Sequence, residues 1–432
     1  MKLGSELRRF ATAQKEPVDA SSLVFFRVMF GLIAVTEAWH YLRRGWVERY
    51  LTGPEIRFSY PGFDWLPAPS ELPMEWGIYL LLLAAIGVTL GRMARASAAA
   101  LALGWGYVFL SDAANYLNHK YLFCVLAGVL AILPAGDHFR VGRRPPLIGS
   151  VPRWTVTILR AQIAIVYTYA GIAKLNADWL AGRPLSTWLS DEGDFPLLGP
   201  FFVDGSAPIA LARAGALIDL TLVPLILWGR TRWFGLAIAV SFHLMNSALF
   251  DIGTFPVMAI ACTLMLLPPE WPRSIFRLPA RQTFCSRPGR IVTAVAACVL
   301  VVQLVLPTRH FFIPGDVHWT EEGHRFAWHM MLRNKRCAMT VRMIDGDDTT
   351  EIEVRDYLTR RQARVTMGNP DMVRQFALEL ANREADGGVL PQVYADVECS
   401  LNGGPRGPLV DPEVDLVTAR PGAPASWIQQ RP

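Results

Sequence analysis

Long apolar blocks joined by short polar connections constrain the fold of this sequence more than any other feature. Nine candidate blocks cover residues 22–42, 75–91, 96–113, 119–135, 154–174, 207–228, 233–250, 252–268 and 290–307. About 17–25 apolar residues are enough for a helix to cross the hydrocarbon core of a bilayer. Only 18% of the residues are charged, against about 25% in a typical soluble domain. The pattern predicts an all-α, multi-pass transmembrane bundle of about nine helices within residues 1–307, embedded in a lipid bilayer.

The basic residues of the connecting segments indicate the orientation of this bundle. The segments that an inside N-terminus would place in the cytoplasm, namely 1–21, 92–95, 136–153, 229–232 and 269–290, together carry 17 Lys and Arg residues, against 7 in the outside loops and the adjoining span ends. The positive-inside rule therefore predicts a cytoplasmic N-terminus and an extracytoplasmic C-terminal domain. The net charge of +5 is then a topology signal, and no nucleic acid is expected as a partner. The first block lacks a cleavage site and is interpreted as an uncleaved span, which would suit a bacterial inner-membrane protein.

The polar segment 308–432 predicts a separate extramembrane domain of mixed α/β structure. Alternating residues predict strands at 338–344, 350–355, 391–399 and 413–418, and the Asn369-Pro370-Asp371 sequence predicts the start of a helix that ends near Arg383. An Asp-Gly-Asp-Asp sequence between the first two strands is typical of a hairpin turn. Whether Cys337 and Cys399 form a disulfide stays open at this stage.

Polar side chains gather at the predicted outer ends of three spans. They are Asn115, Asn118 and His119 beside span four, Lys174, Asn176 and Asp178 at the end of span five, and His243, Asn246 and Asp251 at the end of span seven. Ionisable groups at membrane depth are costly, and they are candidates for a functional site. The alternative is that these are ordinary helix ends with a snorkelling lysine. The coincidence of three helix ends favours a shared polar pocket.

A second group of ionisable residues lies deeper in the predicted spans. Arg160 in span five and Asp219 in span six are interpreted as a structural pair, because a buried charge needs a partner. The histidines show no HExxH motif and the cysteines no CxxC pair. No metal site is therefore expected.

Several segments carry a resemblance to a known family. They are 107–112, 115–122, 159–167, 170–179, 242–253, 269–272, 326–331, 411–415 and 426–429. The most specific runs from Gly171 through Lys174 to Trp179, because such a polar sequence at a span end rarely arises by chance. In these segments the chain resembles the vitamin K-dependent gamma-glutamyl carboxylases. Ala173 departs from the pattern, since the vertebrate enzymes carry a second lysine there, and those enzymes also extend further than Pro432.

The resemblance implies a membrane enzyme that oxidises vitamin K hydroquinone with O2 to the epoxide. The oxidation generates a base that removes a γ-proton from a glutamate of a protein or peptide substrate, and CO2 then adds. The resemblance places the catalytic base on Lys174 and an Asn-His pair on Asn118 and His119. The cofactor-binding residues are then Asn118, His119, His243, Asn246 and Tyr167, with Arg160, Asp219 and Asp178 in supporting positions and no metal.

The chemistry suits these positions. An amine can deprotonate a hydroquinone only when it is neutral, and burial at a helix end in the membrane favours the neutral form of Lys174. His119 or Asn118 would hold the quinone oxygen or stabilise a developing oxyanion. The sequence leaves open whether the quinone is vitamin K or a menaquinone.

Two other functions remain open from the sequence. The first is a quinone-dependent membrane oxygenase that does not carboxylate glutamate. The second is a membrane transporter, or a receptor formed by the C-terminal domain. A transporter would show repeat symmetry between its halves and broken helices near the midplane, and the sequence shows neither.

Overall fold

The computed structural model describes residues 2–136, 140–142, 148–196, 198–203, 206–279, 289–385 and 388–432. Residues 137–139, 143–147 and 280–288, which belong to two of the basic connecting segments, lie outside these ranges.

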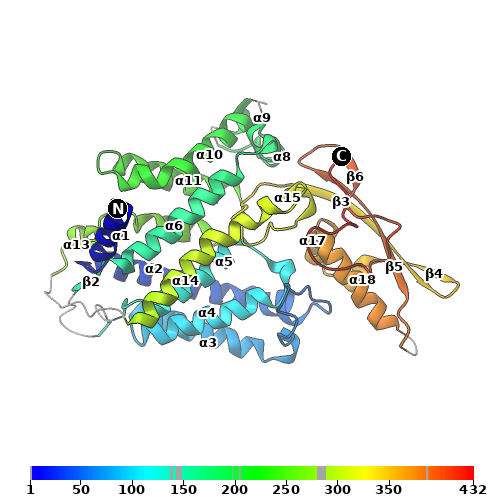
Figure 1. Ribbon diagram of the computed structural model, residues 1–432, viewed down its shortest axis with the longest axis horizontal. Helices are drawn as coiled ribbons and strands as arrows, with labels where there is room; N and C mark the ends of the chain where they lie inside the picture. Colours follow the sequence, from blue (N-terminus) through cyan, green and yellow to red (C-terminus); the bar gives the residue numbers. More distant parts are fainter. Residues whose placement is uncertain are drawn as a thin grey trace.

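Each of the nine predicted apolar ranges corresponds to a helix (Figure 1). The helices are α2 (Ser21–Arg43), α3 (Met74–Leu90), α4 (Ala94–Leu110), α5 (Asn118–Ile132), α6 (Trp154–Ala173), α10 (Ser206–Leu227), α11 (Arg232–Leu249), α12 (Phe255–Leu264) and α14 (Arg290–Val305). In the part of the chain that the structure describes, four helical stretches are long and apolar enough to cross a membrane: Ser21–Arg43, Trp154–Ala173, Ser206–Leu227 and Arg290–Phe312. The count of nine spans therefore stays a prediction.

The helices pack as two groups joined by α6 and α14. In Figure 1 the blue and cyan helices α2 to α5 lie on one side, and α10 and α11 lie on the other. Helix α6 contacts α10, α12 and α14, and α2 contacts both α3 and α12. Gly171 permits the close approach of α6 to α10, because a Cβ added there would lie 2.7 Å from the Leu220 side chain. This contact brings the end of α6 against the middle of α10.

Short elements complete the helical part. They are α1 (Lys2–Ala13), β1 (Pro17–Asp19), β2 (Ser150–Pro152), α7 (Ala177–Leu180), α8 (Arg183–Leu189), α9 (Gly199–Val203), α13 (Trp271–Phe276), a π-helical turn η1 (Glu48–Thr52), and 3₁₀ turns η2 (Pro69–Glu71), η3 (Ala113–Asn115), η4 (Ser190–Glu192) and η5 (Leu306–Phe312). Strands β1 and β2 pair antiparallel.

The C-terminal domain is a four-stranded antiparallel sheet with helices, as the sequence predicted in outline. Its elements are α15 (Val317–Thr320), β3 (Lys335–Asp345), β4 (Asp348–Ile352), α16 (Val354–Tyr357), α17 (Arg360–Met367), α18 (Pro370–Glu384), β5 (Gln392–Leu401) and β6 (Arg406–Pro408). The strand order is β4-β3-β5-β6. Gly346 has a φ of +58°, which suits the tight turn between β3 and β4.

Cys337 and Cys399 form a disulfide in this sheet. They lie directly opposite each other on β3 and β5, with their Cα atoms 4.1 Å apart. The bond that the sequence left open is therefore present in the structure.

The predicted strand at 413–418 is wrong. This segment forms turns, and the Asp415 side chain accepts hydrogen bonds from the backbone N–H groups of Val393 and Val417, each at 3.1 Å. An Asp that bonds its own backbone two residues on favours a turn over a strand. The alternation of apolar residues there reflects packing against the sheet.

The C-terminal domain shares an apolar core with the helical part. Ile56, Phe58 and Tyr60, from the connection between α2 and α3, are buried in one cluster with Phe376 and Leu380 of α18. The backbone N–H of Ser59 also donates to the Gln375 side chain at 2.8 Å. The two parts of the chain are therefore packed together and are not joined by a loose linker.

Candidate functional site

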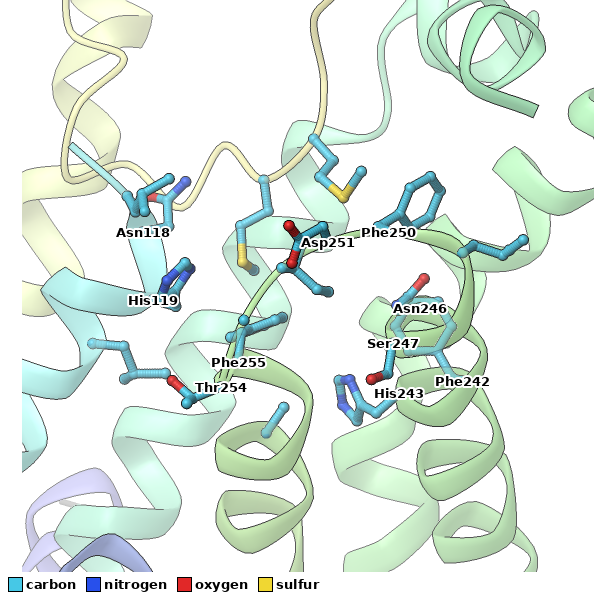
Figure 2. Close-up of a pocket in the computed structure, with 18 of the residues that line it drawn as sticks. Asn118, His119, Phe242, His243, Asn246, Ser247, Phe250, Asp251, Thr254 and Phe255 are labelled. Atoms are coloured by element: carbon cyan, nitrogen blue, oxygen red, sulfur yellow. The ribbon is translucent and has the colours of Figure 1, made fainter. Parts of the chain in front are cut away.

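A cavity of about 1040 Å³ lies inside the helical part, next to the C-terminal domain. Residues from α2, α5, α6, α10, α11 and α12 line it, and Met330, Met331 and Arg361 come from the C-terminal part of the chain. Figure 2 shows one region of its wall, with Asn118 and His119 on one side, His243, Asn246 and Ser247 on the other, and Phe255 between them.

The three helix ends singled out in the sequence meet at this cavity. Asn118 and His119 begin α5, Lys174 caps the end of α6, and His243 and Asn246 lie on α11, and all of them line the cavity. Tyr167, Asp219, Asn115 and Asp251 line it as well. Asn176, Asp178 and Arg160 do not.

Lys174 forms a buried ion pair with Asp219. The distance from Lys174 Nζ to Asp219 Oδ2 is 2.6 Å, and the two residues are only 6% and 5% exposed. The Lys174 Nζ also lies 5.3 Å from the centre of the Trp179 ring. The amine is thus enclosed by one carboxylate and an aromatic face at the wall of the cavity.

The expected pairing of Arg160 with Asp219 is wrong. Arg160 donates instead to the backbone carbonyls of Met265 and Leu267, just after the end of α12. At 1.5 Å per residue, Arg160 and Lys174 are separated by about 21 Å along α6. Arg160 therefore satisfies the unpaired carbonyls at one end of the bundle, while Asp219 meets the lysine near the other.

The hydrogen bonds around Tyr167 assign the tautomer of His243. Tyr167 Oη lies 2.7 Å from His243 Nε2 and 2.9 Å from Thr263 Oγ1. Since Thr263 donates its own proton to the carbonyl of Ala259 at 2.8 Å, it accepts the proton of Tyr167. His243 Nε2 must then carry the hydrogen that it donates to Tyr167. His243 Nδ1 is left as a buried acceptor with no partner among the described residues.

Asn118 and His119 differ in how many hydrogen-bonding groups they have available for a ligand. Asn118 accepts from the Tyr116 hydroxyl at 2.8 Å and donates to the backbone carbonyl of His329 at 2.9 Å. Asn118 therefore ties the start of α5 to the C-terminal part of the chain and keeps only one N–H and one lone pair for a ligand. The His119 ring, 5.9 Å from the Phe255 ring between centroids, has no hydrogen bond to the described residues.

Asp178 joins the helical part to the end of the chain. Its carboxylate lies 3.0 Å from an Arg183 nitrogen and 2.8 Å from an Arg431 nitrogen, and it accepts from Asn402 at 3.0 Å. Arg431 also pairs with Asp316 at 2.9 Å. Asp178 is thus placed to hold the two parts together and is not placed in the cavity wall.

Sequence reasoning missed part of the site. It did not place Met330, Met331 or Arg361 in the pocket, because they approach it only when the C-terminal domain packs against the helices. It singled out neither Arg44 nor Lys120 as a site residue, yet both line the cavity. Over the described ranges, no group of three or more His, Cys, Asp or Glu is placed to hold a metal ion.

Two family models match the chain. Residues 15–271 match the HTTM domain, and residues 288–432 match the lumenal domain of vitamin K-dependent gamma-carboxylase. No solved structure matches the chain. The first match contains Lys174, Asn118, His119 and His243, and the second contains the segment that closes the cavity. The chain therefore belongs to the vitamin K-dependent gamma-carboxylase family, with an HTTM domain followed by the lumenal domain.

Proposed function

We propose that the protein is a membrane vitamin K-dependent gamma-glutamyl carboxylase. It would couple the oxidation of the hydroquinone by O2 to removal of a glutamate γ-proton and addition of CO2. One observation carries this proposal: a buried lysine, in the most specific family segment, forms the polar wall of a large and mostly apolar cavity. A large, mostly apolar cavity with a few convergent polar groups is the usual form of a ligand-binding or active site.

The residues present suit a lipid-soluble hydroquinone. Ligand cavities of drug-sized molecules span about 300–1,000 Å³, and this one has about 1040 Å³. His243 lines the cavity, its Nδ1 is an acceptor without a partner among the described residues, and Tyr167 fixes the ring that carries it. When bound, the hydroquinone supplies the electrons for O2 and, through its oxidation, the strong base of the reaction.

The cavity also has an apolar side that suits entry from the bilayer. Leu211, Met245 and Val257 line it and remain 42%, 37% and 51% exposed. Large apolar side chains exposed on a membrane helix face lipid. The quinone would enter between these residues, whereas the peptide would enter from the side of the C-terminal domain.

The Lys174–Asp219 pair would act through one shared proton. The amine accepts a proton from the hydroquinone only when its own proton is held elsewhere, and Asp219 Oδ2 at 2.6 Å is within direct transfer distance. With its proton passed to Asp219, the Lys174 amine would be free to accept one from the hydroquinone.

The topology belongs to the same proposal. The N-terminus and the C-terminal domain lie at opposite ends of the helical part (Figure 1). The Cys337–Cys399 disulfide suits an oxidising compartment outside the cytoplasm. An extracytoplasmic C-terminal domain would meet exported protein or peptide substrates.

The test uses purified full-length protein in detergent with vitamin K hydroquinone, O2, labelled bicarbonate and a short glutamate peptide. Epoxide and peptide-bound label should appear together and at a fixed ratio. Epoxide without label would show an oxygenase that does not carboxylate glutamate. If neither product forms, with vitamin K or with a menaquinol, the proposed reaction is wrong.

A further inference from the structure

We infer that Arg44 and Arg361 form a carboxylate-binding site at the mouth of the cavity, which recognises the side-chain carboxylate of the peptide substrate. Both residues line the cavity together with Lys120. The inference rests on the proposed function and adds the residues that select an acidic side chain.

The two arginines are exposed and have no carboxylate opposite them. Neither the Arg44 nor the Arg361 side chain has an ion pair or a hydrogen bond with any described residue, and both side chains are exposed. The other cation at this end, Lys120, donates to the Tyr41 hydroxyl at 2.6 Å. Two guanidinium groups with free N–H edges therefore lie in the solvent-exposed part of the cavity lining.

Aromatic rings hold both guanidinium groups in place. The Arg44 Cζ lies 5.4 Å from the centre of the Trp46 ring, and the Arg361 Cζ lies 5.5 Å from the centre of the Tyr50 ring. Arginine stacked on a ring keeps its N–H edge available for a planar anion. Less side-chain freedom is then lost when a carboxylate binds.

The position of Arg361 depends on its neighbour in the chain. Gln362 donates from one amide nitrogen to the Ile56 carbonyl at 2.7 Å and to Asp112 Oδ2 at 3.3 Å. Gln362 also completes a capping box with Thr359 at the start of α17. These contacts fix the first turn of α17 against the helical part, and Arg361 therefore reaches the cavity although it belongs to the C-terminal domain.

The charges that line the cavity favour an anion at this end. Of the lining carboxylates, Asp219 is paired with Lys174, and Glu37 accepts from Thr254 at 3.2 Å. Asp251 lies on the connection between α11 and α12, apart from Asn118 and His119 in Figure 2. In a glutamate held by Arg44 and Arg361 the γ-carbon, which is bonded to the bound carboxylate, would lie beside the cavity that Lys174 also lines.

The same site should bind the product more tightly than the substrate. Addition of CO2 to the γ-carbon turns one carboxylate into two, so the product carries one more negative charge. Fork-like guanidinium groups bind carboxylates through paired, charge-assisted hydrogen bonds. Malonate reproduces the two carboxylates on one carbon and is therefore a suitable competitor.

The experiment measures binding without chemistry. Full-length protein in nanodiscs of neutral lipid is titrated into two fluorescent peptides that differ only in Glu or Gln, without hydroquinone and O2. Fluorescence polarisation should show a preference of about 10- to 100-fold for the Glu peptide, abolished by Arg361→Gln or Arg44→Gln and partly kept by Arg361→Lys. Affinity for the Gln peptide should not change, and malonate should displace the Glu peptide.

Arg49→Gln is the matched control. The Arg49 Cζ lies 5.4 Å from the same Tyr50 ring, but Arg49 does not line the cavity, and the preference for Glu should persist in this variant. Equal binding of both peptides by the wild type, or an unchanged preference in both arginine variants, would overturn the inference. So would a preference that appears only with anionic lipid. Because the readout needs no turnover, an inactive enzyme would refute the proposed function and leave this result intact.

Discussion

The Lys174–Asp219 pair has separable effects on chemistry and on stability. Removal of one member of a buried ion pair typically costs about 3–5 kcal/mol, because the remaining charge loses its partner. A simple truncation of Lys174 therefore tests the base and also perturbs the fold. Replacement of both residues together removes the pair without leaving a buried charge.

Lys174→Ala should abolish epoxide formation and carboxylation together, because both depend on deprotonation of the hydroquinone. A small primary amine added to this variant should restore part of both activities. The double variant Lys174→Ala/Asp219→Asn should unfold at a higher temperature than Lys174→Ala alone and remain inactive, as measured by thermal scanning and product assays. Full activity in either variant would exclude Lys174 as the base.

Tyr167→Phe should weaken the use of hydroquinone by about tenfold. The change removes the hydroxyl that accepts from His243 Nε2 and fixes the tautomer with a free Nδ1 acceptor. We expect KM for hydroquinone to rise more than KM for the peptide, as measured by epoxide formation at varied concentrations of each.

Tyr169→Phe is the matched control for this prediction. Its hydroxyl donates to the Leu304 carbonyl on α14, away from the cavity. Equal effects of the two substitutions on hydroquinone KM would contradict the assigned role of Tyr167.

At the scale of elements, apolar block length predicted the helices well. Each of the nine apolar ranges coincides with a helix, because a long apolar surface leaves a strong local signal in the sequence. The hairpin of β3 and β4, helix α18 and β5 were likewise visible as period-two and helical patterns. The turn at 413–418 was mispredicted because side-chain bonds of Asp415 decide it, and these do not follow from alternation.

Site residues were predictable only where a polar or ionisable residue stands at the end of an apolar helix. Lys174, His119 and His243 stood out as polar groups at span ends, and the structure brings them to one cavity. The partner of Lys174 was not predictable, because which residue of α10 faces the end of α6 depends on how closely the helices approach at Gly171. Arg361 was invisible for a similar reason, since its place depends on docking of the C-terminal domain.

Arg431→Gln should loosen the C-terminal domain by about 1–3 kcal/mol, because it removes one guanidinium that joins Asp178 to Asp316. The expected result is faster limited proteolysis of this domain and a lower thermal midpoint. Arg183→Gln, which removes a half-exposed partner of the same Asp178, should cost less than about 1 kcal/mol. A larger effect of Arg183→Gln would contradict the role of Arg431 as the main link.

At the scale of the whole molecule, the junction between the two parts is sensitive to acid. His318, His324 and His329 are buried there, with the rings of His318 and His324 both near that of His329. Burial lowers the pKa of His318 to about 4 and of His329 to about 2, and holds the pKa of His324 well below its usual range. The neighbouring arginines and histidines act in the same direction on His324 and His329.

The unfolded chain binds these protons near pH 6.5, and the folded chain does not. Stability should therefore be complete above about pH 6.5 and fall as the pH drops toward 4, by about 1.4 kcal/mol per histidine for each pH unit. Burial raises the pKa of Glu322, so the folded chain takes up this proton at a higher pH than the unfolded chain and gains stability on acidification. This single carboxyl opposes the effect of the three imidazoles. Thermal midpoints at pH 7.5, 6.5 and 5.5 in one detergent measure the slope.

His329→Gln should reduce the slope of stability against pH by the contribution of about one proton. The ring nitrogens of His329 have no hydrogen-bond partner among the described residues, so the neutral amide replaces it without loss of a bond. A midpoint that is constant or rises on acidification would contradict the prediction.

The short segment that carries Met330 and Met331 closes the cavity, and the Asn118 side chain anchors the backbone of the preceding residue. In a chimera that joins the HTTM domain of one family member to the lumenal domain of another, part of the cavity wall would therefore come from a different protein than the rest. Such exchanges should succeed only when the residues that meet at this seam are transplanted as a set. In this chain both matched domains contribute walls to the cavity, so neither domain encodes it alone.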